Sequence, residues 1–286
     1  MRSTELFQHT ACWDQGQAAE MHHLPLILIH GLGLDHHCFD GMVPALAQSH
    51  RVITFDLAGH GETPFVEDER PSLDLFARQT LEVMDRFHID QAVLIGFSLG
   101  GMINRRFAID YPDRVKGLVI MNSPHDRGEA GQKAVEDRAI KTRDEGVAAT
   151  MDATLDRWFT ASFRSKHPAV MRNTAKQLQQ NDPNWYADCR FVLAAGVKEL
   201  IKPQPPITCP SLVMTCEHDS GSTVAMSAAI ATEIAPSETV IIPHLQHLGL
   251  IEAPSLFHVA IIRLLKAFHQ VIDFAKTLID RLLVFV

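Results

Sequence analysis

The sequence predicts an α/β fold with a mostly parallel central sheet flanked by helices, and two patterns predict it. First, short apolar runs rich in β-forming residues recur along the chain, at residues 26–29, 52–55, 92–95, 118–121, 212–215 and 240–242. Strands that are apolar at nearly every residue are buried on both faces, as in a parallel sheet covered by helices. Second, most intervals between these runs hold a helix-like segment, and such alternation is typical of an open α/β sheet.

The helix-like segments carry ordinary helix signals. Segment 72–87 begins with Ser72, a residue type that caps helix N-termini, and its apolar residues fall near one face. Segments 103–109 and 224–234 each follow one of the predicted strands. We therefore expect these three segments to be helices that cover the sheet.

One long interval breaks the alternation. Residues 123–206 contain no strong strand signal, include several aromatic residues and end in the proline-rich stretch 202–206. This pattern predicts a helical cap inserted between two strands, with residues 1–122 and 207–286 forming the α/β core. The alternative is a string of connecting helices that has no role in substrate selection.

The end of the chain predicts a further helix. Residues 256–286 follow a helical pattern, and the last five, 282–286, are all apolar. Such a tail either packs on the core or forms the contact of a homodimer, and the sequence leaves both open.

Composition excludes several classes of partner. Lys and Arg number 26 against 34 Asp and Glu, and the net charge of −8 without a basic stripe argues against nucleic acid and anionic lipid as partners. No stretch of about 20 apolar residues occurs, and the polar N-terminus lacks the pattern of a secretory signal, so we expect no membrane span. The 5 scattered cysteines fit a reducing cytoplasm, and no histidine falls in a metal-ligand spacing, so we expect no metal and no other cofactor.

A glycine-rich turn follows the run 92–95 and precedes a helical segment. Its sequence is Gly-Phe-Ser-Leu-Gly-Gly, residues 96–101. A serine on so sharp a strand-to-helix turn needs small residues two positions away on each side, and Gly96 and Gly100 meet that need. The helix N-terminus also favours negative charge that develops beside the hydroxyl. We therefore predict that Ser98 is a nucleophile; the alternative is a tight turn with an idle serine.

A second glycine turn, His30-Gly31-Leu32-Gly33, follows the run 26–29. Acyl transfer produces an oxyanion that two preorganised backbone N–H groups can bind. Leu32 and Leu99, the residue after the predicted nucleophile, are the expected donors. We expect His30 to support its turn through bonds from its ring to the backbone rather than to act as a base.

An acidic loop follows the run 212–215. Functional residues of parallel sheets gather at the carboxyl ends of the strands, which is where this loop lies. Asp219 is the preferred carboxylate, with Glu217 as its rival. The alternative for Asp219 is a cap on the helix that follows.

A histidine loop follows the run 240–242. Serine needs a base to take its proton, and imidazole titrates near neutrality. We predict that His247 is this base, with His244 as its rival. The order Ser98, Asp219, His247 is the chain order found in α/β hydrolases.

Together these stretches resemble the α/β-hydrolase superfamily. The resemblance rests on HGLG at 30–33, RVITFDLAGHG at 51–61, GFSLGG at 96–101, EHDSGST at 217–223 and HLGLIEAP at 247–254. Within the superfamily, Tyr-Pro-Asp-Arg-Val at 111–115 and Arg-Trp-Phe-Thr at 157–160 are similar to 3-oxoadipate enol-lactonases. Cys216 departs from their usual glycine, and the tail is longer than theirs.

The resemblance implies a small ester or lactone as the substrate and an acyl-enzyme on Ser98. Hydrolysis of carbon–carbon bonds in ring-cleavage products, and cofactor-free haloperoxidase or perhydrolase activity, are alternatives with the same residues. A ligand receptor on a hydrolase fold is the non-enzymatic alternative.

A substrate that carries a carboxylate would need a cation in the pocket. The candidates in or near the cap are Arg127, Arg138 and Arg157, and Trp158 is a candidate for the pocket lining. Each arginine has the alternative of being a solvated surface residue, and the tryptophan that of a core residue.

Overall fold

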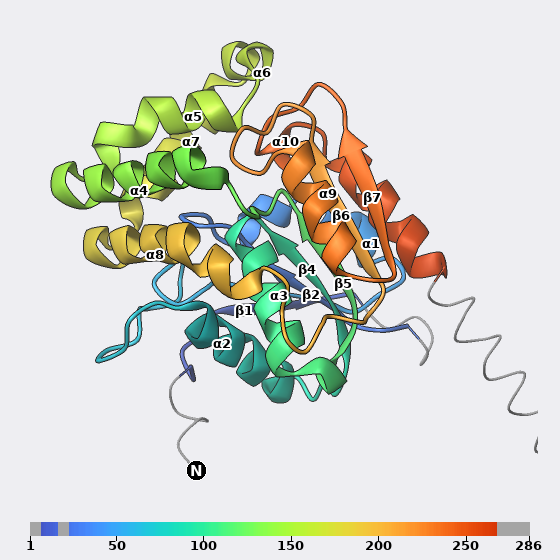
Figure 1. The fold of residues 1–286 in the computed structure, drawn as a ribbon. Coiled ribbons are helices and arrows are strands. Elements are labelled where there is room, and N and C mark those ends of the chain that lie inside the picture. The colour runs from blue at the N-terminus through green and yellow to red at the C-terminus, as the bar shows by residue number, and fades with distance from the viewer. Residues whose placement is uncertain (1–6, 17–22, 268–286) are drawn as a thin grey trace, which may run out of the picture.

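The sheet is the framework of the computed structural model, which describes residues 7–16 and 23–267 (Figure 1). Within these residues it has seven strands in the order β1-β3-β2-β4-β5-β6-β7. All neighbouring strands are parallel except β1, which runs antiparallel to β3. The bounds are β1 (Cys12–Gln15), β2 (Leu26–Ile29), β3 (Val52–Phe55), β4 (Ala92–Phe97), β5 (Val115–Met121), β6 (Ser211–Cys216) and β7 (Ser237–Ile242).

Each predicted apolar run lies in one of the parallel strands, and the predicted fold class is confirmed. β2, β3, β4 and β6 are buried along their whole length, as expected for strands covered on both faces. The edge strand β1 was not predicted, because it is half-exposed and its residues are mixed in polarity.

Helices cover both faces of the sheet. In Figure 1, α2 (Leu73–Arg86), α3 (Leu99–Asp110) and α9 (Val224–Glu233) lie in front of it, and α1 (Val43–Leu46) lies behind. α3 begins at Leu99 rather than at the predicted residue 103. Glycines are poor helix formers, but a Cβ on Gly100 would lie 2.0 Å from the carbonyl oxygen of Ile29, so close packing requires glycine there.

Short elements and one further helix complete the core. The short elements are η1 (His36–Phe39), η2 (Pro112–Arg114) and α10 (Gly249–Glu252). Residues 254–267 are helical and begin close to the turn before α1, since a Cβ on Gly41 would lie 2.7 Å from Pro254. The last residues of the predicted tail helix, 282–286, lie outside the described residues. No helix within the described ranges is long and apolar enough to cross a bilayer.

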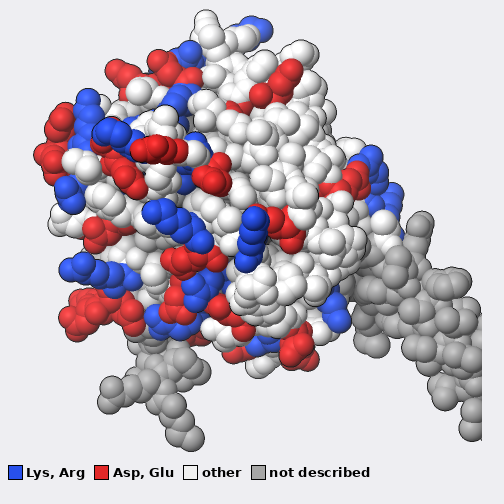
Figure 2. All heavy atoms as spheres, viewed as in Figure 1, with Lys and Arg blue, Asp and Glu red and all other residues white. Residues whose placement is uncertain are grey.

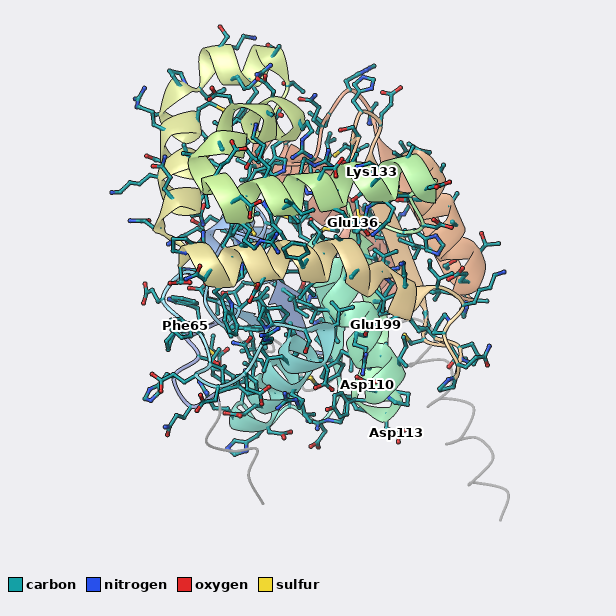
Figure 3. All side chains as sticks on the ribbon, turned by 60° about the vertical axis from the view of Figure 1, so that its left-hand side comes forward. Phe65, Asp110, Asp113, Lys133, Glu136 and Glu199 are labelled. Carbon is teal, nitrogen blue, oxygen red and sulfur yellow. The ribbon has the colours of Figure 1, made fainter. Side chains whose placement is uncertain are left out.

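The interval 123–206 is mainly helical and contains no strand. Its elements are α4 (Gly128–Glu145), η3 (Val147–Thr150), α5 (Met151–Trp158), α6 (Ala161–Lys166), α7 (Pro168–Gln180), α8 (Pro183–Ala195) and η4 (Gly196–Leu200). α4 and α8 lie side by side in Figures 1 and 3. We refer to residues 123–206 as the cap segment. Figure 2 shows acidic and basic side chains mixed over its visible face.

Specific contacts attach the cap segment to the loop after β3. The indole Nε1 of Trp185 donates to the carbonyl oxygen of Ala58 at 2.8 Å. Gly59 has a φ of +72°, and a Cβ there would lie 2.1 Å from the indole ring. Phe65, labelled in Figure 3, stacks on the same ring with centroids 5.7 Å apart. Any larger residue at position 59 would therefore displace the start of α8.

Two further contacts hold the other parts of the cap segment. Arg106 of α3 bridges Asp110 and Glu199 at 2.6 Å each, and Figure 3 labels these two acidic residues. Thr160 donates its backbone N–H and its hydroxyl to the carboxylate of Glu252, both at 2.7 Å. The second contact links the end of α5 to α10.

The strand order sets the position of the site. β2 lies between β3 and β4, so the chain leaves β2 to one side and later returns on the other side of it. The carboxyl ends of β2 and β4 are adjacent, with Ile29 beside Gly96. Ligands of open α/β sheets bind at such a reversal of strand order. Both predicted glycine turns begin here.

Candidate active site

Ser98 occupies a strained turn between β4 and α3. Its φ of 56° lies in the left-handed region that non-glycine residues rarely adopt, and only 6% of its surface is exposed. A Cβ on Gly96 would lie 2.2 Å from the carbonyl oxygen of Gly100, so the turn closes only with glycine at position 96. The backbone thus holds the serine hydroxyl above the end of the sheet.

The structure brings the three residues Ser98, Asp219 and His247 together. Nε2 of His247 lies 3.1 Å from Oγ of Ser98, and its Nδ1 lies 2.6 Å from Oδ2 of Asp219. Asp219 follows β6 and His247 follows β7, so the side chains meet at the carboxyl edge of one sheet. Hydroxyl, imidazole and carboxylate form one hydrogen-bonded chain.

The carboxylate of Asp219 is buried and fully engaged. Oδ1 accepts the backbone N–H groups of Gly221 and Ser222 at 2.8 and 3.0 Å, and Oδ2 accepts Nδ2 of Asn122 at 2.9 Å. Burial alone would raise the pKa of Asp219, but the charge of His247 and these hydrogen bonds hold it below the ordinary value of 3.8. The group is therefore ionised at neutral pH and orients the imidazole.

Asn122 was missed by the sequence analysis. It follows β5 directly and has a φ of 47°, a conformation that asparagine tolerates better than most residues. Its position at the carboxyl end of a predicted strand was the signal available. We expect Asn122 to act as a positioning residue through Asp219.

The rival residues lie elsewhere. The side chains of Glu217 and His244 are 44% and 86% exposed, and the Glu217 carboxylate accepts the backbone N–H of His244 at 2.8 Å. α9 is capped by Thr223, whose hydroxyl accepts the N–H of Met226, so Asp219 does not serve as its cap.

The two predicted oxyanion donors flank the serine. Leu99 is the first residue of α3, where a backbone N–H has no partner within the helix. Leu32 lies in the turn after β2 and lines the same pocket as Ser98. A Cβ on Gly31 would lie 3.1 Å from Cβ of Ser98, so the turn passes very close to the serine. Their role as donors stays a prediction.

The ring of His30 is bound on both sides by the backbone. Its Nδ1 lies 2.8 Å from the carbonyl oxygen of Gly31, and its Nε2 accepts the N–H of Leu57 at 2.9 Å. Burial lowers the pKa of His30, so the ring is neutral, with Nδ1 as the donor. Since both nitrogens are engaged, His30 holds the turn that carries Leu32.

His60 makes stability depend on pH. Burial, and then the nearby His30, lower its pKa from 6.5 to about 3. Below pH 6.5 the unfolded chain takes up a proton that the folded chain refuses until about pH 3, so stability falls as the pH drops through this window. We expect His60 to account for a loss of about 2 kcal/mol in the free energy of unfolding between pH 6.5 and 5.

Urea unfolding at pH 7.5, 6 and 5 measures this effect. His60→Gln should lose less stability across the range than the wild type. His218→Gln, at an exposed position, is the matched control and should follow the wild type. Equal losses in all three proteins would contradict the assignment.

A cavity of about 70 Å³ lies over Ser98 and His247. The core contributes Leu32 and Phe97 to its wall, and the cap segment contributes Trp158 and Tyr186. Trp158 is 8% exposed, and its ring centroid lies 6.0 Å from that of His247. The small volume and the aromatic wall fit a small organic substrate.

All three predicted arginines, Arg127, Arg138 and Arg157, line this cavity. A fourth arginine, Arg190 of α8, also lines it and was not predicted, because one arginine on a predicted helix carries no distinguishing signal. Arg127 donates to the carbonyl oxygens of Leu193 and Ala194 at 3.0 and 3.4 Å. It therefore ties the start of the cap segment to the end of α8.

One group in the described part of the chain has side chains placed to hold a metal ion. Ligand atoms of Glu217, His218 and His244 lie within 4.8 Å of one another, and all three residues are exposed. They come from two loops, which is why spacing along the sequence did not reveal them. Nothing in the chemistry of Ser98 requires this group.

Comparison with known proteins agrees with the fold. Residues 25–254 match the family described as alpha/beta hydrolase fold. Over 247 residues the chain is 28% identical to 3-oxoadipate enol-lactonase 2 of Acinetobacter baylyi, covering 85% of this chain and 89% of the relative. It is 25% identical over 230 residues to (E)-2-((N-methylformamido)methylene)succinate hydrolase of the same organism, covering 80% and 86%.

A solved structure is similar over nearly the whole chain. The enol-lactonase from Burkholderia xenovorans LB400 superimposes with a TM-score of 0.81 at 26% identity, covering 90% of this chain and 96% of that one. With the family match over most of its length, the chain belongs to the α/β-hydrolase family. It is an enzyme of that family, a hydrolase that resembles enol-lactonases and related esterases.

Proposed function

We propose that the protein is a serine hydrolase that cleaves a small carboxylic ester or lactone through an acyl-enzyme on Ser98. The observation that carries the proposal is the continuous hydrogen-bonded chain from Ser98 through His247 to Asp219, beside a small cavity. The similarity to an enol-lactonase over most of both chains supports a lactone as one substrate class.

In the first step, Oγ of Ser98 attacks the carbonyl carbon while Nε2 of His247 takes its proton. The carbonyl oxygen becomes an oxyanion held by the N–H groups of Leu32 and Leu99, and the imidazolium is stabilised by Asp219. The bond to the leaving oxygen then breaks, and His247 gives that oxygen the proton. In a lactone the leaving oxygen stays attached to the acyl chain, so this step opens the ring.

In the second step, water replaces the leaving group. His247 removes a proton from water as the hydroxide portion attacks the acyl carbon, and a second oxyanion forms in the same place. Its collapse breaks the bond to Oγ, which regains its proton from the imidazolium. The products are a carboxylic acid and an alcohol, or a hydroxy acid from a lactone. An enol lactone gives an oxo acid, because the released enol becomes a ketone.

Trapping the acyl-enzyme tests this scheme. Rapid mixing with p-nitrophenyl acetate should give a burst of p-nitrophenolate of about one equivalent if deacylation is the slower step. Phenylmethylsulfonyl fluoride should add one sulfonyl group, and peptide mass spectrometry should place it on Ser98. Protein treated with reagent that has first been hydrolysed in buffer serves as the control. Modification confined to another residue would reject the proposed nucleophile.

A further inference from the structure

Three arginines converge on the cavity from three different helices of the cap segment. Arg138 lies on α4, Arg157 on α5 and Arg190 on α8, and all three line the cavity over Ser98. Arg190 is 8% exposed, and the other two are half-buried. Figure 3 shows how α4 and α8 run beside each other above the core. With Arg127, which also lines this cavity, an acidic protein has thus placed four arginines around the space over Ser98.

None of these three guanidinium groups is paired with a carboxylate anywhere in the described ranges. The cavity wall contains no Asp or Glu, and no ion pair involves Arg138, Arg157 or Arg190 within those ranges. Arg190 donates to the hydroxyl of Tyr186 at 3.1 Å, and its buried Nε has no partner. The guanidinium of Arg190, which lines the cavity, therefore keeps a buried donor without an acceptor.

The three charges also act on one another. Burial, and then the charges of Arg138 and Arg190, lower the pKa of Arg157 to about 10. Burial and Arg190 likewise lower the pKa of Arg138. Asp219 attracts Arg157, but its oxygens are already occupied by His247, Asn122 and two backbone N–H groups. Without an anion the cluster is unfavourable, since charges buried without a partner cost free energy.

We propose that the natural acyl group carries at least two carboxylates, which Arg138, Arg157 and Arg190 bind while Ser98 attacks a separate carbonyl. The inference rests on the proposed function and adds the substrate class. One carboxylate engages one guanidinium bidentately and would leave the others unpaired. The small cavity further favours a compact carbon skeleton.

Binding of unreactive acids tests the charge count without any catalytic step. Butyrate, glutarate and tricarballylate place one, two and three carboxylates on the same three-carbon chain, and propylphosphonate places one phosphonate on it. Titration calorimetry at low salt and pH 7.5 should show affinity rising about tenfold or more with each added carboxylate, because charge-assisted hydrogen bonds are strong. Equal affinities for the three acids, or tightest binding of the phosphonate, would overturn the proposal.

Arginine variants show which groups bind the probe. Arg138→Gln and Arg157→Gln should each weaken tricarballylate at least tenfold and leave butyrate nearly unchanged. Arg172→Gln, at an exposed position of α7, is the matched control and should bind as the wild type does. Without ligand, both cavity variants should melt at or above the wild-type temperature, because a repulsion is removed. Marked loss of stability in both would instead assign the arginines to holding the cap segment together.

The two proposals fail in different ways. Hydrolysis of p-nitrophenyl acetate together with equal binding of the three acids would remove the polycarboxylate assignment and leave the serine mechanism intact. Graded binding of the acids without any esterase activity would support the anion site and count against the acyl-enzyme.

Discussion

Ser98→Ala should lower kcat for p-nitrophenyl acetate by roughly 10⁴- to 10⁶-fold. The methyl group cannot attack a carbonyl, and only the backbone donors and the positioned water would remain to assist hydrolysis. Stability should change little, because the N–H of Ser98 bonds to the carbonyl oxygen of Met121 at 2.8 Å through the backbone, which the substitution keeps. Steady-state rates with the free-ester background subtracted measure the effect.

Ser220→Ala is the matched control for this variant. Ser220 lies in the loop beside Asp219 but is exposed to solvent. It should keep wild-type kcat and KM. Retention of more than about a hundredth of the activity in Ser98→Ala would show that another group forms the covalent intermediate.

Asp219→Asn should lower kcat by roughly 10⁴-fold while the fold survives. An amide N–H facing Nδ1 of His247 donates a hydrogen bond to it, so Nδ1 becomes the acceptor and the imidazole proton lies on Nε2. That nitrogen then cannot accept the proton of Ser98. The N–H groups of Gly221 and Ser222 can still bond to the amide oxygen, so the loop is expected to keep its conformation.

Glu217→Gln is the matched control for the carboxylate. Glu217 lies two positions earlier in the same loop, with a side chain 44% exposed. It should retain wild-type turnover. A comparable loss in both variants would mean that the loop, rather than the buried charge, limits the reaction. Thermal melts of both proteins would separate that outcome from simple unfolding.

Much of the fold could be predicted because the chain repeats a local pattern. Most of the parallel strands are apolar along nearly all their length, and β2 and β3 coincide with the predicted runs. β1 escaped prediction because an edge strand with one neighbour needs little apolar surface. The first turn of α3 was not predicted because glycine has a low helix propensity. Its glycines are needed for close packing against the end of β2, and this tertiary contact cannot be read from the local sequence.

Some residues of the candidate site could likewise be predicted from the sequence, and others could not. Ser98 was accessible from sequence because its turn demands glycines at fixed positions. Asp219 and His247 were accessible because each stands in the loop after a recognisable strand. Asn122 and Arg190 were not, because their significance lies in what they face across the fold: a carboxylate from another loop, and guanidinium groups from two other helices.

The hydrogen bonds between the end of α5 and the segment that follows His247 limit which substitutions can change the substrate preference of this enzyme. The carbonyl oxygen of Trp158 accepts the backbone N–H of Leu248, the residue after His247, at 2.8 Å, and Thr160 is held by Glu252 just beyond it. Replacing the whole cap segment would therefore also move the imidazole of His247 away from Ser98. Laboratory evolution toward other acids should instead proceed by exchanging side chains on α4 and α8, with the joint at 158–160 left as it is.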